Sequence, residues 1–101
     1  MIPERYRVYP CGDYFGSPQF TRGYFDEEAQ FTTFYAAADV VEYPALGFLA
    51  IGGPGVDGIE WGYRCGESGL WAYYPITSEF VYLAPTVAAL FEGWSSGRIN
   101  V

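Results

Sequence analysis

Asp57 and Glu60 lie three positions apart, a spacing that could serve acid–base catalysis or hold a divalent cation. Glu60 stands between the apolar residues Ile59 and Trp61, and this alternation places its side chain on the solvent face of a strand. A calcium loop needs a longer run of oxygen ligands, and the paired carboxylates of a hydrolase need a cleft that a chain this small barely provides. We therefore expect both side chains to be solvated charges at the edge of a sheet.

Nucleophilic catalysis is the next chemistry to consider, because the chain has several serines and the two cysteines Cys11 and Cys65. The sequence contains no histidine and no lysine. Histidine is the commonest general base and the commonest metal ligand, and a serine or cysteine nucleophile depends on a neighbouring base. We expect no catalytic residue, no metal site and no cofactor, and so a protein that is not an enzyme.

The stretch IGGPGVDG at residues 51–58 has the glycine content of a phosphate-binding loop. No Lys-Ser or Lys-Thr pair follows it, and the next residues alternate as a strand does instead of beginning a helix. We therefore expect a tight loop between two strands.

The length of 101 residues predicts a single domain that spans residues 1–101. Half of the residues are hydrophobic and 21% are aromatic, which suits one core and argues against disorder. This is more apolar surface than a single small core is able to hide, so some aromatic side chains should be exposed. An exposed aromatic patch usually marks a site for a partner.

The net charge is −7, and all the cations are arginines scattered along the sequence. Nucleic-acid binding draws most of its affinity from clustered Lys and Arg, so we expect no nucleic-acid partner. The negative charge attracts cationic surfaces, so we expect a basic protein partner. Residues 1–10 lack the apolar run of a signal peptide, and no stretch reaches the roughly 18 apolar residues of a membrane span. We expect a cytoplasmic protein with no membrane contact, in which Cys11 and Cys65 are reduced, small buried hydrophobic residues.

The second half of the chain predicts consecutive short strands, because apolar runs and alternating patterns are separated by Gly-rich turns. The first of these strands is uniformly apolar, so it should be buried on both faces. Short turns between successive strands make the sheet antiparallel. The segments are a strand at 48–51, a loop at 52–58, a strand at 59–64, a hairpin turn at 65–69, a strand at 70–76 and an edge strand at 79–83.

An amphipathic helix follows the last strand. Pro85 suits its first turn, and Gly97 stands where a C-cap glycine belongs. The fold class is therefore α+β: a small antiparallel sheet packed by a C-terminal helix and a short central helix. The apolar side chains of the C-terminal helix follow the i, i+3, i+4, i+7 spacing of one face, at Val87, Leu90, Phe91 and Trp94.

The first 43 residues have a less regular pattern. Residues 1–24 are rich in Pro, Gly and aromatics without a period, which predicts an irregular segment with one or two short extended pieces. Residues 25–43 fit either an amphipathic helix or a strand through 31–35 followed by a short helix through 36–43. The AAADVVE stretch is helical in both interpretations, and Pro44 ends it.

The stretch FLAIGGPGVDGIEWGYRCGESGLWAYYPI at residues 48–76, followed by LAPTVAALFEGW at residues 83–94, resembles the SUKH superfamily. This superfamily includes Smi/Knr-type cell-wall regulators and many bacterial toxin-immunity proteins. The upstream stretch FYAAADVVE at residues 34–42 looks like the strand and short helix that precede the apolar strand in the family, which favours strand then helix here. The resemblance implies a binding scaffold without catalytic residues.

These observations predict a non-enzymatic protein-binding module, with an immunity protein that sequesters a basic, nuclease-type toxin domain as the main hypothesis. The alternatives are a regulatory scaffold of the same fold and a binder of a small ligand or carbohydrate that uses exposed aromatic side chains. The oligomeric state is left open. The expected partner-binding residues come from turn ends and outward strand faces: Asp57, Glu60, Glu67, Trp71, Tyr73 and Glu79.

Overall fold

The computed structural model describes residues 2–27 and 30–101. Within these residues, seven strands form one antiparallel sheet of order β1-β2-β4-β5-β6-β7, and β3 pairs with β4 as β2 does. The expected α+β class is confirmed. The strands are β1 (Arg22–Asp26), β2 (Phe31–Ala36), β3 (Val41–Tyr43), β4 (Phe48–Gly52), β5 (Glu60–Arg64), β6 (Leu70–Tyr74) and β7 (Glu79–Ala84). The α-helices are α1 (Gly12–Phe15), α2 (Pro18–Thr21) and α3 (Val87–Ser95), and the 3-10 turns are η1 (Glu4–Tyr6), η2 (Ala37–Asp39) and η3 (Pro44–Leu46).

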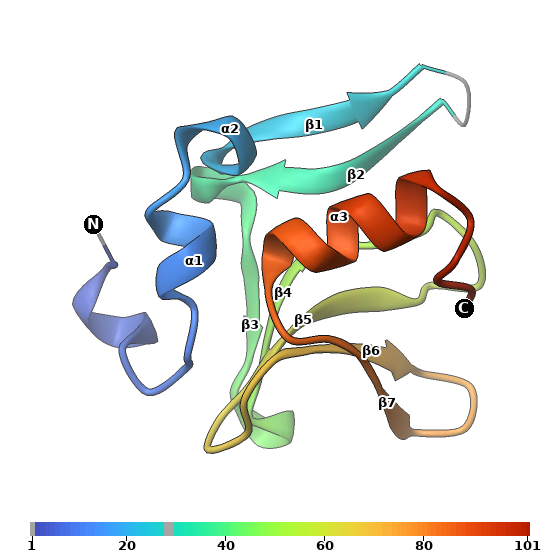
Figure 1. Cartoon of the computed structure of the whole chain (residues 1–101). Helices are drawn as coiled ribbons and strands as arrows, with labels where there is room; N and C mark the ends of the chain where they lie inside the picture. The colour runs from blue at the N-terminus through green and yellow to red at the C-terminus, as the bar shows by residue number, and fades with distance from the viewer. Residues whose placement is uncertain (1, 28–29) are drawn as a thin grey trace.

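Helix α3 lies inside the curve of the sheet, with β1 and β2 on one side of it and β6 and β7 on the other (Figure 1). Its buried side chains Val87 and Leu90 belong to the same core cluster as Leu49, Trp61 and Tyr63 of the central strands. Successive side chains of a strand point to opposite faces. These contacts therefore identify the inner face of the sheet, and the residues in between point away from α3.

Strand β4 is buried along its whole length, as its apolar run predicts. Two glycines let the neighbouring strands approach closely. A Cβ atom at Gly62 would overlap the carbonyl oxygen of Leu49, and a Cβ atom at Gly52 would overlap the carbonyl oxygen of Thr33. Backbone atoms cannot move aside as a flexible side chain can, so only glycine fits at these two positions.

We expected Pro85 in the first turn of the C-terminal helix. Helix α3 instead begins two residues later, and Pro85 lies outside it. Thr86 is the N-cap, and its hydroxyl oxygen accepts a hydrogen bond from the backbone N–H of Ala89 at 3.1 Å. A threonine at this position satisfies one of the N–H groups that lack a partner in the first helical turn. Beyond the helix, Gly97 has a φ of 80°, the left-handed conformation expected of a glycine there. In the described part of the chain, no helix is long and apolar enough to cross a lipid bilayer.

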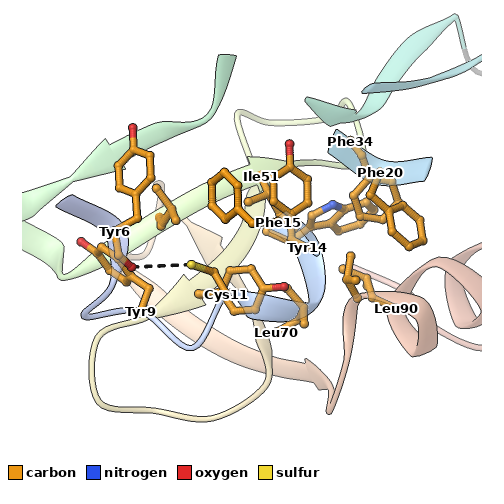
Figure 2. Close-up of a cluster of buried hydrophobic side chains, with 14 of the residues drawn as sticks. Tyr6, Tyr9, Cys11, Tyr14, Phe15, Phe20, Phe34, Ile51, Leu70 and Leu90 are labelled. Atoms are coloured by element: carbon orange, nitrogen blue, oxygen red, sulfur yellow. Dashed lines mark hydrogen bonds between the residues drawn. The ribbon is translucent and has the colours of Figure 1, made fainter. Parts of the chain in front are cut away.

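Residues 2–24, the described part of the first segment, differ from the irregular, partly extended structure that we expected; Met1 lies outside the described residues. They form η1, α1 and α2, and strand β1 starts at Arg22. Their side chains extend along the core: Tyr6 and Tyr14 each contact Phe15, whereas Phe20 lies apart from them and packs on Phe34 (Figure 2). A helical turn this short has little stability of its own, so tertiary packing and not a sequence period determines its place.

The central segment contains a strand and only one turn of helix. Strand β2 covers the FTTFY run, which confirms the strand interpretation and overturns the all-helical one. The short central helix, expected to reach residue 43, is limited to η2, and Val41–Tyr43 form β3 instead. The reason is pairing with β4, which places Val41 opposite Ala50 and Tyr43 opposite Phe48. Burial of the cross-strand neighbours outweighs local helix propensity here.

The two cysteines have different environments. Cys11 is fully buried, and its thiol donates a weak hydrogen bond to the carbonyl oxygen of Tyr6 at 3.6 Å (Figure 2). Burial raises the pKa of the Cys11 thiol to about 11. Cys65 is exposed in the turn between β5 and β6, so the expectation that it is buried is wrong. Both thiols are free.

Candidate functional site

The face of the sheet that points away from α3 carries a row of aromatic and charged side chains. The register identifies these residues: Gly62 lies opposite Ala50 and Trp71, whereas Trp61 and Tyr63 on either side of it point into the core. We call this surface the outer face. It consists of Tyr43, Phe48, Glu60, Arg64, Trp71, Tyr73, Phe80 and Tyr82.

Phe48 is the centre of an aromatic layer on the outer face. Its side chain is fully buried although it lies outside the core cluster around α3. Its ring centroid is 5.4 Å from that of Phe80, 6.1 Å from that of Tyr73 and 6.3 Å from that of Tyr43. These rings come from four different strands, so the sheet holds them in a fixed arrangement. The layer is a second, smaller apolar cluster whose outer rings remain partly accessible.

Arg64 lies at one end of this aromatic layer. The central carbon of its guanidinium lies 4.2 Å from the centroid of the Phe80 ring and 4.8 Å from that of Trp71. Trp71 in turn makes an edge contact with Tyr82 at 5.4 Å, and its indole N–H donates to the carbonyl oxygen of Ser68 at 3.0 Å. Cation–π contacts hold an arginine over rings without using its N–H groups. Arg64 is therefore positioned to bind an acceptor from outside the molecule.

Glu60 lies toward the other end of the outer face. Its Oε2 accepts a hydrogen bond from the hydroxyl of Tyr35 at 2.7 Å, and its Oε1 accepts one from the hydroxyl of Tyr43 at 2.6 Å. Tyr73 lies directly opposite Glu60 on the neighbouring strand. The carboxylate is thus fixed in orientation by two strands that are distant from it in sequence. The partly exposed carboxylate keeps accepting capacity for a donor from a partner.

The tyrosines around Glu60 hold their protons more tightly than free tyrosine does. The hydrogen bond to the Glu60 carboxylate is the main cause that raises the pKa of Tyr43 to about 12, and burial adds to it. Burial is the main cause that raises the pKa of Tyr35, followed by its hydrogen bond to Glu60. Both hydroxyls therefore remain donors to the carboxylate at neutral pH, and neither acts as a base.

The structure brings together three of the six residues expected to bind a partner. Glu60, Trp71 and Tyr73 share the outer face, as the alternation of their strands predicts. Asp57 and Glu67 are exposed in the connections that precede and follow β5, so they lie near its two ends. Glu79, the sixth residue, begins β7 on the inner side of the sheet and is exposed. Asp57 and Glu67 are therefore peripheral to the aromatic layer, and Glu79 lies on the opposite face of the sheet.

Five residues of the outer face were not among the expected ones: Tyr43, Phe48, Arg64, Phe80 and Tyr82. Arg64 has the same alternation as Glu60, so the sequence contained the signal for it. Phe80 pairs with Tyr73 across β6 and β7, and the expected edge strand would also have indicated it. Tyr43 could not be found, because the helix expected through residue 43 removed it from the sheet.

Within residues 2–27 and 30–101, no group of three or more His, Cys, Asp or Glu side chains is placed to hold a metal ion. Comparisons of the chain with protein-family models, curated proteins and solved structures find no match. The chemistry of the outer face is therefore the basis for a functional assignment.

Proposed function

We propose that this protein is a non-enzymatic binding module that captures a basic protein partner through the outer face of its sheet. The observation that carries this proposal is the aromatic layer with Glu60 and Arg64 fixed toward its two ends. Tyr, Trp and Arg are the residue types that most often supply binding energy at protein interfaces. A rigid sheet presents them with little loss of conformational entropy on binding.

The arrangement of charge supports a basic partner. The chain carries a net charge of −7, and the exposed carboxylates Asp57 and Glu67 flank the aromatic layer at the two ends of β5. An apolar centre with a polar rim is the usual anatomy of a protein interface. An acidic rim also accelerates encounter with a cationic surface and rejects acidic competitors.

The resemblance to the SUKH superfamily makes the proposal more specific. The resemblance lies in residues 48–76 and 83–94, which form β4 to β6 and the stretch from the end of β7 through most of α3. On that basis we propose an immunity protein that sequesters a basic toxin domain of the nuclease type. A regulatory scaffold of the same fold, with a cellular partner in place of a toxin, is the alternative within this class.

A non-catalytic role for Glu60 fits its hydrogen bonds. A general acid or base must exchange a proton with a substrate at an accessible atom. Both carboxylate oxygens of Glu60 already accept hydrogen bonds from tyrosines that keep their protons at neutral pH. Such a carboxylate serves better as a fixed acceptor for a guanidinium or ammonium group than as a proton carrier.

A carbohydrate site is the second candidate function. A hollow of about 320 Å³ adjoins the outer face and is lined by Phe31, Tyr35 and Glu60 together with the loop around Gly55 and Val56. Aromatic rings and a fixed carboxylate are groups that bind sugar hydroxyls and their apolar faces. Sugar binding at this hollow would raise the melting temperature by an amount that grows with the logarithm of the ligand concentration above the dissociation constant.

The proposed function is tested by affinity capture from lysate of the source cells, followed by measurements on the purified partner. The test variant is Tyr82→Ala, and Phe25→Ala is its matched control, since the two rings are 50% and 51% exposed but lie on opposite edge strands. We expect Tyr82→Ala to raise the dissociation constant by about tenfold or more and Phe25→Ala to leave it unchanged. The association rate should fall steeply with salt.

Two results separate the candidates. A captured protein that arrests growth when expressed alone, and is tolerated when this chain is co-expressed, supports the immunity role. Equal loss of partner binding in the Tyr82 and Phe25 variants would contradict the outer face as the binding site. A melting temperature that rises with a glycan panel, with no protein captured, would move the assignment to the carbohydrate site.

A further inference from the structure

Strand β7 forms one edge of the sheet, and among the described residues no strand pairs with it along the edge opposite β6. The backbone N–H and C=O groups on that side are therefore free of strand partners. An exposed edge of this kind is a template for pairing with another strand, and most proteins protect it with charges, Pro, bulges or very short strands.

The other edges of the sheet carry such protection. Strand β1 contains Arg22 and Asp26, has Gly23 at a φ of 88° and shifts register between Tyr24 and Phe25. Strand β3 is only three residues long and contains an acidic residue. These features disfavour the addition of a further strand at either place.

Strand β7 lacks these protections over most of its length. Its pairing with β6 is regular from Glu79 to Tyr82, and the register shifts only beyond that stretch. Its sequence EFVYLA contains one charge and no Pro. Val81 is 44% exposed on the inner side and Tyr82 is 50% exposed on the outer side. Both faces of this edge therefore present apolar surface next to unpaired backbone groups.

We propose that β7 pairs antiparallel with β7 of a second copy of this chain, so that two sheets join into one across a two-fold axis at Val81. This axis places Phe80 opposite Tyr82 of the other copy, twice, on the outer side of the joined sheet. Aromatic cross-strand pairs are among the most favourable in antiparallel sheets. The same axis places Glu79 opposite Leu83 of the other copy, so the two Glu79 carboxylates do not lie opposite each other.

Charge distinguishes this partner from the basic protein proposed above. Two copies that each carry −7 repel one another, and added salt screens that repulsion. Self-pairing at β7 should therefore strengthen with salt, whereas binding of a basic partner weakens with salt. The dimer does not depend on the proposed function, and it would present two outer faces side by side to whatever those faces bind.

The test measures the mass of the purified full chain by sedimentation over a hundredfold range of concentration, at about 0.05 M and about 0.5 M sodium chloride. We expect a monomer–dimer equilibrium that shifts toward dimer at high salt. Val81→Lys should weaken it by about tenfold or more, because it places two like charges opposite each other. Val41→Lys is the matched control, a similarly exposed edge-strand valine (38%) on the distant strand β3, and should leave it unchanged.

Hydrogen exchange on the wild-type chain covers the case in which a variant fails to fold. The β7 amides that point outward should exchange more slowly as concentration rises, while those of β1 should not change. A monomer at every concentration and salt, or a dimer weakened equally by both variants, would overturn the proposal. Protection of β7 amides only on addition of a basic partner would also overturn it and would assign the edge to that partner.

Discussion

The carboxylate of Asp13 accepts a hydrogen bond from the backbone N–H of Val87 at 2.7 Å, although 74 positions separate the two residues. The other oxygen of Asp13 accepts a hydrogen bond from the hydroxyl of Tyr63. One side chain thus connects α1, the first turn of α3 and the central strand β5. A negative charge at a helix N-terminus is stabilising in itself, because it satisfies free N–H groups and the helix dipole.

Asp13→Ala should lower the free energy of unfolding by about 2–3 kcal/mol, because it removes a charged acceptor and leaves the buried Tyr63 hydroxyl without its partner. Asp13→Asn should cost less, since the amide oxygen still accepts one hydrogen bond. Chemical denaturation with urea gives both values. Glu92→Gln is the control at an exposed residue of α3, and an equal loss in this variant would contradict the assignment.

Alkaline pH should unfold the protein cooperatively. Burial raises the pKa of Tyr14, and burial with the hydrogen bond to Asp13 raises the pKa of Tyr63, both well above the usual value of 10.0. Above that pH the unfolded chain releases these protons and the folded chain keeps them, so the unfolded state binds fewer protons and stability falls as pH rises. The loss from each of the two residues approaches about 1.4 kcal/mol per pH unit above pH 10 and is negligible more than about one pH unit below it.

Circular dichroism and phenolate absorbance, followed together on raising the pH, check this expectation. The absorbance of the buried tyrosines should appear only as the structure is lost, and Tyr63→Phe should make the pH dependence shallower. Phenolate absorbance that appears in full while the circular dichroism stays native would show that these hydroxyls are accessible in the folded state.

The sequence predicts the second half of the fold well, for a local physical reason. Strand β4 is an uninterrupted apolar run, and the alternation in β5 is by itself enough to assign Trp61 and Tyr63 to the core and Glu60 to the opposite face. Side-chain periodicity is a local property, and in this part of the chain each element packs mainly on its neighbours in sequence.

The structure of the first half of the chain depends on long-range contacts, which the periodicity of the side chains does not indicate. Tyr14 donates its hydroxyl proton to the carbonyl oxygen of Tyr35, and Tyr9 donates to Glu42 at 2.8 Å, so short N-terminal turns depend on strands far along the chain. Strand β3 depends in the same way on β4. The sequence predicted a helix there, and that error removed Tyr43 from the expected binding face. Long-range pairing decided both cases, and local propensity could not indicate it.

Glu60→Gln should return the pKa of Tyr43 from about 12 toward its usual value, because the hydrogen bond to the carboxylate is the main cause of the shift. NMR titration of the tyrosine ring signals, over the pH range in which the circular dichroism stays native, should show the Tyr43 signal beginning to shift at lower pH in Glu60→Gln than in the wild type. Glu42→Gln is the matched control, since Glu42 accepts the hydrogen bond of Tyr9 and does not contact Tyr43 in this way. An unchanged Tyr43 pKa in Glu60→Gln would mean that the two groups do not interact in solution.

Gly62→Ala should lower the free energy of unfolding by about 3 kcal/mol or more, because the added Cβ would overlap the backbone carbonyl of Leu49 between β4 and β5. The strands would have to separate at the centre of the sheet, directly beneath the outer face. Gly12→Ala is the control: its Cβ would lie 3.7 Å from the Ile2 side chain, an ordinary contact, in the first turn of α1. Thermal unfolding of both variants makes the comparison, and a Gly62→Ala protein as stable as the wild type would show that β4 and β5 are farther apart than the structure places them.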